Sequence, residues 1–100
     1  MNSLTVDDLI ERATEAYAAL ELLGEEIEAE WTYVTDLEAA WLARLAEVRS
    51  ARGPDRVEPP TAAAIDRAIE EIGLVRDPHR AIDWLSTFPQ VVLVALGEGL

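Results

Sequence analysis

Apolar residues recur at spacings of three and four through the first half of the chain. This spacing places apolar side chains on one face of an α-helix or coiled-coil seam, with acidic residues roughly opposite. Thr5, followed by Asp7 and Asp8, is typical of a helix start, because a side-chain oxygen caps the first turn and acids suit its positive end. We therefore expect a long amphipathic helix over about residues 5–52. The apolar series consists of Ile10, Ala13, Tyr17, Leu20, Ile27, Trp31, Val34, Trp41, Leu45 and Val48.

The apolar series slips by one position at Gly24 and again at Glu38, where Leu23 and Leu37 take over. A straight helix of about 3.6 residues per turn drifts in this way against a 3.5-residue repeat. A break near Gly24, giving an antiparallel hairpin, is the alternative, but hairpin connections normally carry more turn-forming residues than one glycine. The pattern favours a continuous or kinked helix and leaves the hairpin open.

Glycine and proline divide the second half into short elements, since all five prolines lie beyond residue 52. Residues 53–60 predict a turn and an extended linker, because a proline restricts the residue before it. Helices are predicted at 61–73, 77–88 and 90–96, and Asp77-Pro78 is a typical helix start. The apolar run 91–94 also suits a strand, but the sequence offers it no partner strand.

These elements predict an all-α protein with a single domain. It would consist of a long acidic amphipathic helix at 1–52, a turn or linker at 53–60, and a C-terminal cluster of three short helices at 61–100. The N-terminal residues lack the pattern of a signal peptide, and the longest apolar run, Val91 to Leu96, is too short to span a bilayer. We expect a soluble protein of the cytoplasm or of a virion.

Composition narrows the range of functions. The 100 residues carry 20 acidic and 8 basic side chains, for a net charge of −12. Binding to nucleic acid or to an anionic membrane requires clustered basic residues, and the large excess of acidic residues argues against both. With no cysteine and one histidine, the chain cannot form thiolate metal sites or most histidine-based metal centres. We expect no cofactor, no direct nucleic-acid partner and no membrane partner.

The acidic helix is the one candidate for metal chemistry. The segment Glu25-Glu26-Ile27-Glu28-Ala29-Glu30 superficially resembles the Glu-Glu-x-x-Glu group with which all-α nucleotide pyrophosphohydrolases of the MazG type bind Mg²⁺. Its spacing differs from that group, and Asp36 and Glu38 do not supply the Glu-x-x-Asp group that follows in that family. Mg²⁺ needs oxygen ligands that converge on one point, whereas these acids spread around a helix. We interpret them as a solvated face.

Nucleophilic catalysis would require His79 beside Ser50 or Ser86, together with an orienting acid. Nothing in the spacing of these residues indicates such an arrangement. We predict that the protein has no catalytic residues.

The large apolar side chains are the remaining candidates for a functional site. Tryptophan is enriched among the residues that dominate protein–protein binding, and the C-terminal half is too short to cover a stripe of this length. Core packing is the alternative role for the same residues. The predicted interface consists of Tyr17, Leu20, Ile27, Trp31, Val34, Trp41, Leu45, Trp84, Phe88, Val92 and Leu96.

We therefore expect a non-catalytic structural or assembly protein that acts through helix-mediated protein–protein contacts, as a homo-oligomer or within a larger complex. Small subunits of phage heads, tails or packaging machinery have a similar compositional profile. Two alternatives stay open. One is an acidic inhibitor or DNA mimic that occupies a basic site on a partner, and the other is a metal-dependent all-α nucleotide hydrolase.

Overall fold

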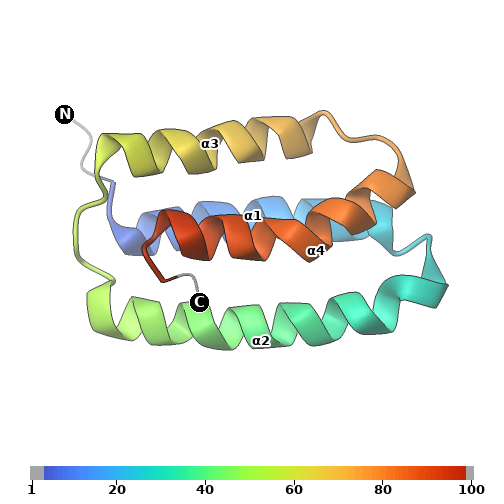
Figure 1. The fold of residues 1–100 in the computed structure, drawn as a ribbon, viewed down its shortest axis with the longest axis horizontal. Coiled ribbons are helices and arrows are strands. Elements are labelled where there is room, and N and C mark those ends of the chain that lie inside the picture. Colours follow the sequence, from blue (N-terminus) through green and yellow to red (C-terminus); the bar gives the residue numbers. More distant parts are fainter. Residues whose placement is uncertain (1–3, 99–100) are drawn as a thin grey trace.

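Four helices run alternately in opposite directions along the long axis of the molecule (Figure 1). We describe them from a computed structural model that covers residues 4–98, without the side chains of residues 28–32. The helices are α1 (Val6–Gly24), α2 (Glu28–Arg52), α3 (Pro59–Gly73) and α4 (Pro78–Ala95). The prediction of an all-α protein is confirmed. None of these helices is both long enough and apolar enough to cross a lipid bilayer.

The first half of the chain is a helical hairpin, which is the alternative that the sequence left open, and not the continuous helix that it favoured. The chain leaves the helical conformation at Ile27, where ψ is 76°, and the Ile27 N–H donates to the Gly24 carbonyl at 3.0 Å. Burial explains the reversal. Folding back lets both apolar faces be covered within one molecule, and each Å² of apolar surface removed from water contributes about 25 cal/mol. This outweighs the weak local turn signal.

The second half contains two helices instead of the three expected, because α4 continues through Pro89. Residues 91–94 are therefore helical and do not form a strand. Proline has no N–H, so the carbonyl of Leu85, four residues earlier, loses its usual helical partner. The hydroxyl of Tyr17 in α1 donates to this carbonyl over 3.4 Å. A side chain from another helix thus satisfies the group that Pro89 leaves without a bond.

The connection between α2 and α3 crosses the end of the bundle against the start of α1. The N–H of Val6 donates to the Asp55 carbonyl at 2.9 Å, and the N–H of Asp7 donates to the Gly53 carbonyl at 3.0 Å. The first N–H groups of a helix have no partner within the helix itself. The carbonyls of this crossing connection accept hydrogen bonds from two of these N–H groups. The connection also places α3 on the far side of α1 from α2.

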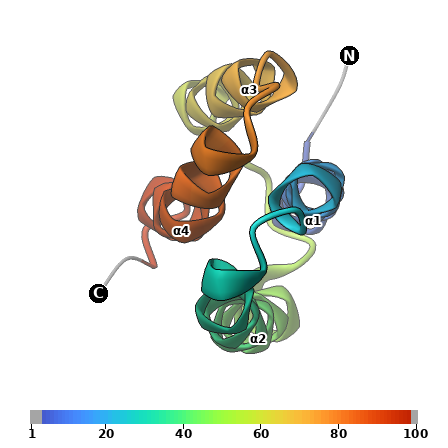
Figure 2. The same cartoon turned by 90° about the vertical axis from the view of Figure 1, so that its right-hand side faces the viewer.

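The cross-section of the bundle is a rhombus (Figure 2). Helices α1 and α4 pack against each other along the short diagonal, and each also contacts α2 and α3. Among the described residues, no Cα atom of α2 lies within 8 Å of a Cα atom of α3. The molecule measures 41 × 25 × 19 Å, and one apolar core draws on all four helices.

Candidate interaction surface

Most residues of the predicted interface lie inside the bundle. Ile27 and Trp84 are partly buried against the core, and the side chain of Trp31 lies outside the described residues. The remaining side chains are buried in the core of this single chain and need no partner to cover them. Core packing is the alternative role that the sequence left open for them. Tyr17, Leu20, Val34, Trp41, Leu45, Phe88, Val92 and Leu96 are each at most 4% exposed.

An aromatic cluster forms the middle of this core. The ring of Trp41 lies 4.9 Å from that of Tyr17 and 6.1 Å from that of Phe88, measured between centroids. Burial raises the pKa of the Tyr17 hydroxyl well above its ordinary value, so the group stays protonated and keeps its donor role. The indole N–H of Trp41 has no hydrogen-bond partner among the described residues. The cluster is enclosed, so we assign it to stability.

A pair of carboxyl groups lies between α1 and α2. Glu21 is hydrogen-bonded to Glu38, and burial, this hydrogen bond and the nearby charges of Glu38 and Glu25 raise the pKa of Glu21 to about 7. Two carboxyls are too few to hold a metal ion without further ligands. Among the described side chains, no group of three or more potential ligands comes together. The side chains of Glu28 and Glu30 in the acidic segment lie outside the described residues.

The residues considered for nucleophilic chemistry do not come together. The Ser86 hydroxyl donates to the Ile82 carbonyl at 3.0 Å. His79 is exposed in the first turn of α4, where its backbone N–H donates to the Asp77 carboxylate at 3.2 Å.

A hollow of the described surface lies beside the connection between α3 and α4. We call it the Trp84 trough. Its volume is about 560 Å³, and Glu71, Leu74, Val75, Arg76, Asp77, Arg80 and Trp84 line it. Trp84 is partly buried against the core, whereas Leu74 is 78% exposed. The trough therefore combines an aromatic ring, an exposed aliphatic side chain and two guanidinium groups.

A second hollow, the α1–α3 groove, lies on the other side of the end of α3. Its volume is about 310 Å³, and its lining includes Leu20 and Leu23 of α1 and Ile69 of α3. Val75 and Arg76 line both hollows. The last turn of α3 is thus flanked by recesses that meet at the connection to α4.

The arginines of the bundle fall into two groups. Those with carboxylate partners tie elements together; for example, Arg12 bonds Asp66 at 3.1 Å, and Arg44 and Arg52 bond Glu98 at 2.8 and 2.7 Å. Among the described side chains, which exclude those of residues 28–32, Arg76 and Arg80 have no carboxylate within 4.0 Å, and neither do Arg56 and Arg67. Arg76 instead donates to the carbonyl of Gly73, the last residue of α3, and to that of Val75 in the connection, at 2.8 Å from each. The two arginines of the trough are therefore open to a carboxylate from another chain.

The trough shares only Trp84 with the predicted interface. The sequence did carry a local signal for the rest, because Arg76, His79 and Arg80 fall within five residues of an otherwise acidic chain. The sequence pattern did not predict that Leu74, which follows an amphipathic helix, would be exposed. Comparison with protein-family models, curated proteins and solved structures gave no match to this chain.

Proposed function

We propose that this chain is a non-catalytic assembly module that binds another protein chain through the Trp84 trough. The observation that supports this function is that the partly buried Trp84 lies in one trough with two arginines that lack a carboxylate partner among the described side chains. Tryptophan and arginine are the residue types most enriched where protein interfaces derive their binding energy. An exposed aliphatic side chain at the rim, Leu74, adds apolar surface that binding would remove from water.

This proposal keeps the expected function but moves its surface. The apolar stripe of the first half was expected to need a partner, because a single long helix would leave it uncovered. The hairpin covers that stripe within one chain. Among the large apolar side chains that stay exposed, Leu74 has the highest exposed fraction, and the exposed Arg80 lines the same trough. A partner with apolar and carboxylate side chains would complement it.

Site-specific photocrosslinking tests this proposal. The sequence has no lysine, so amine-reactive reagents would find no side chain to modify. A photoreactive amino acid should instead replace Leu74 (78% exposed), with Val94 (59% exposed) as the matched control on the outer face of α4. We expect adducts heavier than the chain from position 74, both with purified protein and in cells of its own organism, and far fewer from position 94.

Substitutions in the trough should weaken these adducts. Trp84→Ala removes an aromatic anchor, and losses of about 2 kcal/mol or more, about thirtyfold in affinity, are common at such positions. Arg80→Ala is a second variant with an exposed side chain, so its effect on binding can be separated from an effect on folding. Absence of adducts at position 74, or equal adducts at positions 74 and 94, would contradict the proposed function.

A further inference from the structure

One end of the bundle carries the connections α1–α2 and α3–α4 on opposite halves of the same face (Figure 2). The α1–α2 half is acidic. Glu25 and Glu26 are exposed in the α1–α2 connection. Leu22, in the last turn of α1, is 73% exposed. Among the side chains that the structure describes, no ion pair engages either of these two carboxylates. This half therefore presents free negative charge beside an exposed leucine.

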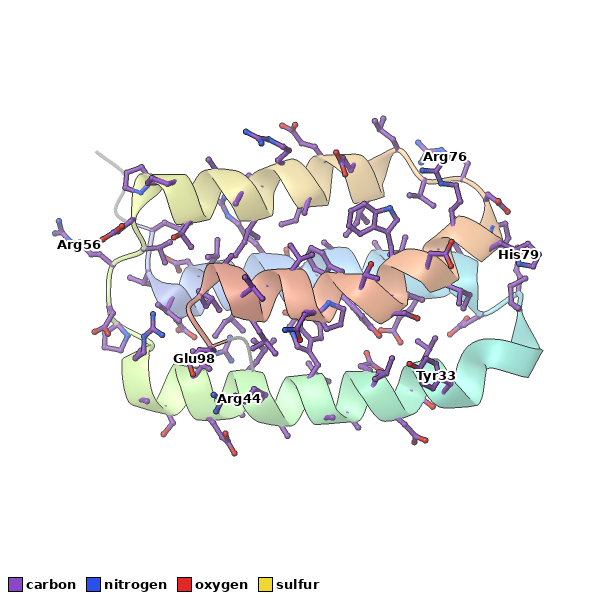
Figure 3. The ribbon with its side chains drawn as sticks, viewed as in Figure 1. Tyr33, Arg44, Arg56, Arg76, His79 and Glu98 are labelled. Atoms are coloured by element: carbon purple, nitrogen blue, oxygen red, sulfur yellow. The ribbon has the colours of Figure 1, made fainter. Side chains whose placement is uncertain are left out.

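The α3–α4 half carries the complementary groups. Arg76 and His79 lie at this end of the molecule (Figure 3), and Arg76 and Arg80 line the Trp84 trough. Glu71 and Asp77 line the trough as well, but neither lies within 4.0 Å of a guanidinium. The start of α4 adds the positive end of a helix dipole. This half therefore presents two guanidinium groups that have no carboxylate partner among the described side chains, beside an exposed leucine. The Arg76 guanidinium also donates to two backbone carbonyls.

We infer that this end of the bundle binds the same end of a second copy of the chain, with the arginine half of each copy against the acidic half of the other. A two-fold axis in the plane of the end face exchanges the two halves, so one rotation creates both contacts at once. Two-fold dimers require such a self-complementary surface. This inference rests on the proposed function and names the partner of the Trp84 trough.

At the opposite end of the bundle, Arg49 pairs with Asp7 and Arg52 pairs with Glu98. Arg56 is exposed there (Figure 3) and has no ion pair among the described side chains. The contact at the first end is limited by the cross-section of 25 × 19 Å, which is smaller than the area that stable complexes bury. We therefore expect a weak dimer, with a Kd on the order of 100 µM.

Sedimentation velocity over a concentration series tests this inference with the complete chain. At concentrations up to about 500 µM, several times the expected Kd, the average mass should rise from 11.0 kDa toward twice that value. Arg76→Glu with Arg80→Glu should hold the protein at the mass of one chain. The matched control, Arg56→Glu with Arg67→Glu, makes the same charge change at two exposed positions outside the trough and should dimerise like the wild type.

A mixing experiment makes the test specific for the two-fold arrangement. A second variant, Glu25→Arg with Glu26→Arg, reverses the acidic half and should also be monomeric by itself. Mixed with the arginine-reversed variant, it should form a one-to-one dimer, because both contacts again pair opposite charges. One variant is more negative than the wild type and the other is less negative, so mean repulsion in the mixture changes little. A misfolded variant would not recover binding.

Three results would overturn the inference. They are a wild-type chain that keeps the mass of one chain at the highest concentration, a dimer that survives both charge reversals, and a mixture that fails to associate. The proposed function would fail separately, through the absence of adducts at position 74. Adducts from position 74 to a different protein, together with a monomeric wild type, would contradict only the second copy as partner.

Discussion

Tyr17 supplies a hydrogen bond that the backbone of α4 cannot make by itself. Its hydroxyl donates to the Leu85 carbonyl, whose usual helical donor is missing because residue 89 is proline. Tyr17→Phe keeps the ring and leaves a buried acceptor without a bond. We expect a loss of about 1–3 kcal/mol in the free energy of unfolding, measured by denaturant titration.

A double-mutant cycle with Pro89→Ala tests the cause of this loss. Alanine at position 89 supplies an N–H that can donate to Leu85 within the helix. In that background, Tyr17→Phe should cost less than half as much as in the wild type, because the carbonyl no longer depends on the tyrosine. Equal costs in the two backgrounds would show that Tyr17 contributes through its ring packing against Trp41 and not through this hydrogen bond.

At the scale of residues, the sequence identified most buried positions but few of their specific partners. The three-and-four spacing marks Leu20, Val34 and Leu45 as members of one apolar face, and the structure buries all three. The hydrogen bond of Tyr17 joins groups 68 residues apart, and no local pattern encodes such a pair. The same holds for the trough, because the exposure of Leu74 depends on how α4 turns back along α3.

The end of α2 is the element boundary with the strictest steric requirement. Gly53 donates to the Arg49 carbonyl at 2.8 Å and accepts from the N–H of Asp7 at 3.0 Å. A Cβ at this position would lie 2.6 Å from the Arg49 oxygen. Gly53→Ala must therefore shift either the last turn of α2 or the connection that pairs with α1. We expect a loss of about 1–3 kcal/mol, the usual range for forced overpacking, measured by thermal and denaturant unfolding.

Gly73, the last residue of α3, is the matched control for this substitution. A Cβ at Gly73 would meet no atom within 4 Å. Gly73→Ala should leave stability unchanged or raise it by about 0.4–1 kcal/mol, because alanine has less freedom to lose from the unfolded chain. Similar effects of the two alanine substitutions would contradict the steric explanation for Gly53.

At the scale of elements, the sequence predicted correctly that these segments are helical, but it did not predict where several of the helices end. The start of α4 after Asp77 follows from local chemistry, and the structure shows the Asp77 side chain accepting from the His79 N–H. Local chemistry does not predict the break after Gly24 or the continuation of α4 through Pro89. Burial of apolar side chains across the bundle favours the hairpin. Pro89 is tolerated inside α4 because another helix supplies the missing hydrogen-bond donor. The slip in the apolar series at Gly24 marked a helix end rather than a helical drift.

At the scale of the whole molecule, the fold confines 20 acidic side chains and only 8 basic ones to a particle of 41 × 25 × 19 Å. Repulsion among like charges opposes the compact state. The carboxyl pair of Glu21 and Glu38 concentrates this cost in one place, because α1 and α2 hold the two groups together and Glu25 lies nearby. The hairpin that covers the apolar stripe thus also brings like charges together.

Stability should therefore fall as the pH rises from about 4.5 to about 7. The folded chain holds the Glu21 proton up to a pKa of about 7, whereas the ordinary value is 4.5, so the folded state binds more protons than the unfolded state throughout this interval. The stabilising effect of the proton is complete below pH 4.5 and is lost above pH 7. Asp8 acts in the opposite direction, since the backbone N–H of Thr5 lowers its pKa from 3.8, and its contribution is lost only in stronger acid.

Glu21→Gln isolates the contribution of this one carboxyl. Glutamine keeps a hydrogen-bond donor toward Glu38 and carries no charge at any pH, so the variant should melt at a higher temperature than the wild type at pH 8. Its melting temperature should also change less between pH 5 and pH 7, while the two proteins should converge near pH 4, where Glu21 is protonated in both states. Glu15→Gln removes one negative charge from an exposed position on the same helix and serves as the control for net charge. If Glu15→Gln flattened the pH profile as much as Glu21→Gln, the dependence would come from overall repulsion, and the α1–α2 carboxyl pair would have no special part in it.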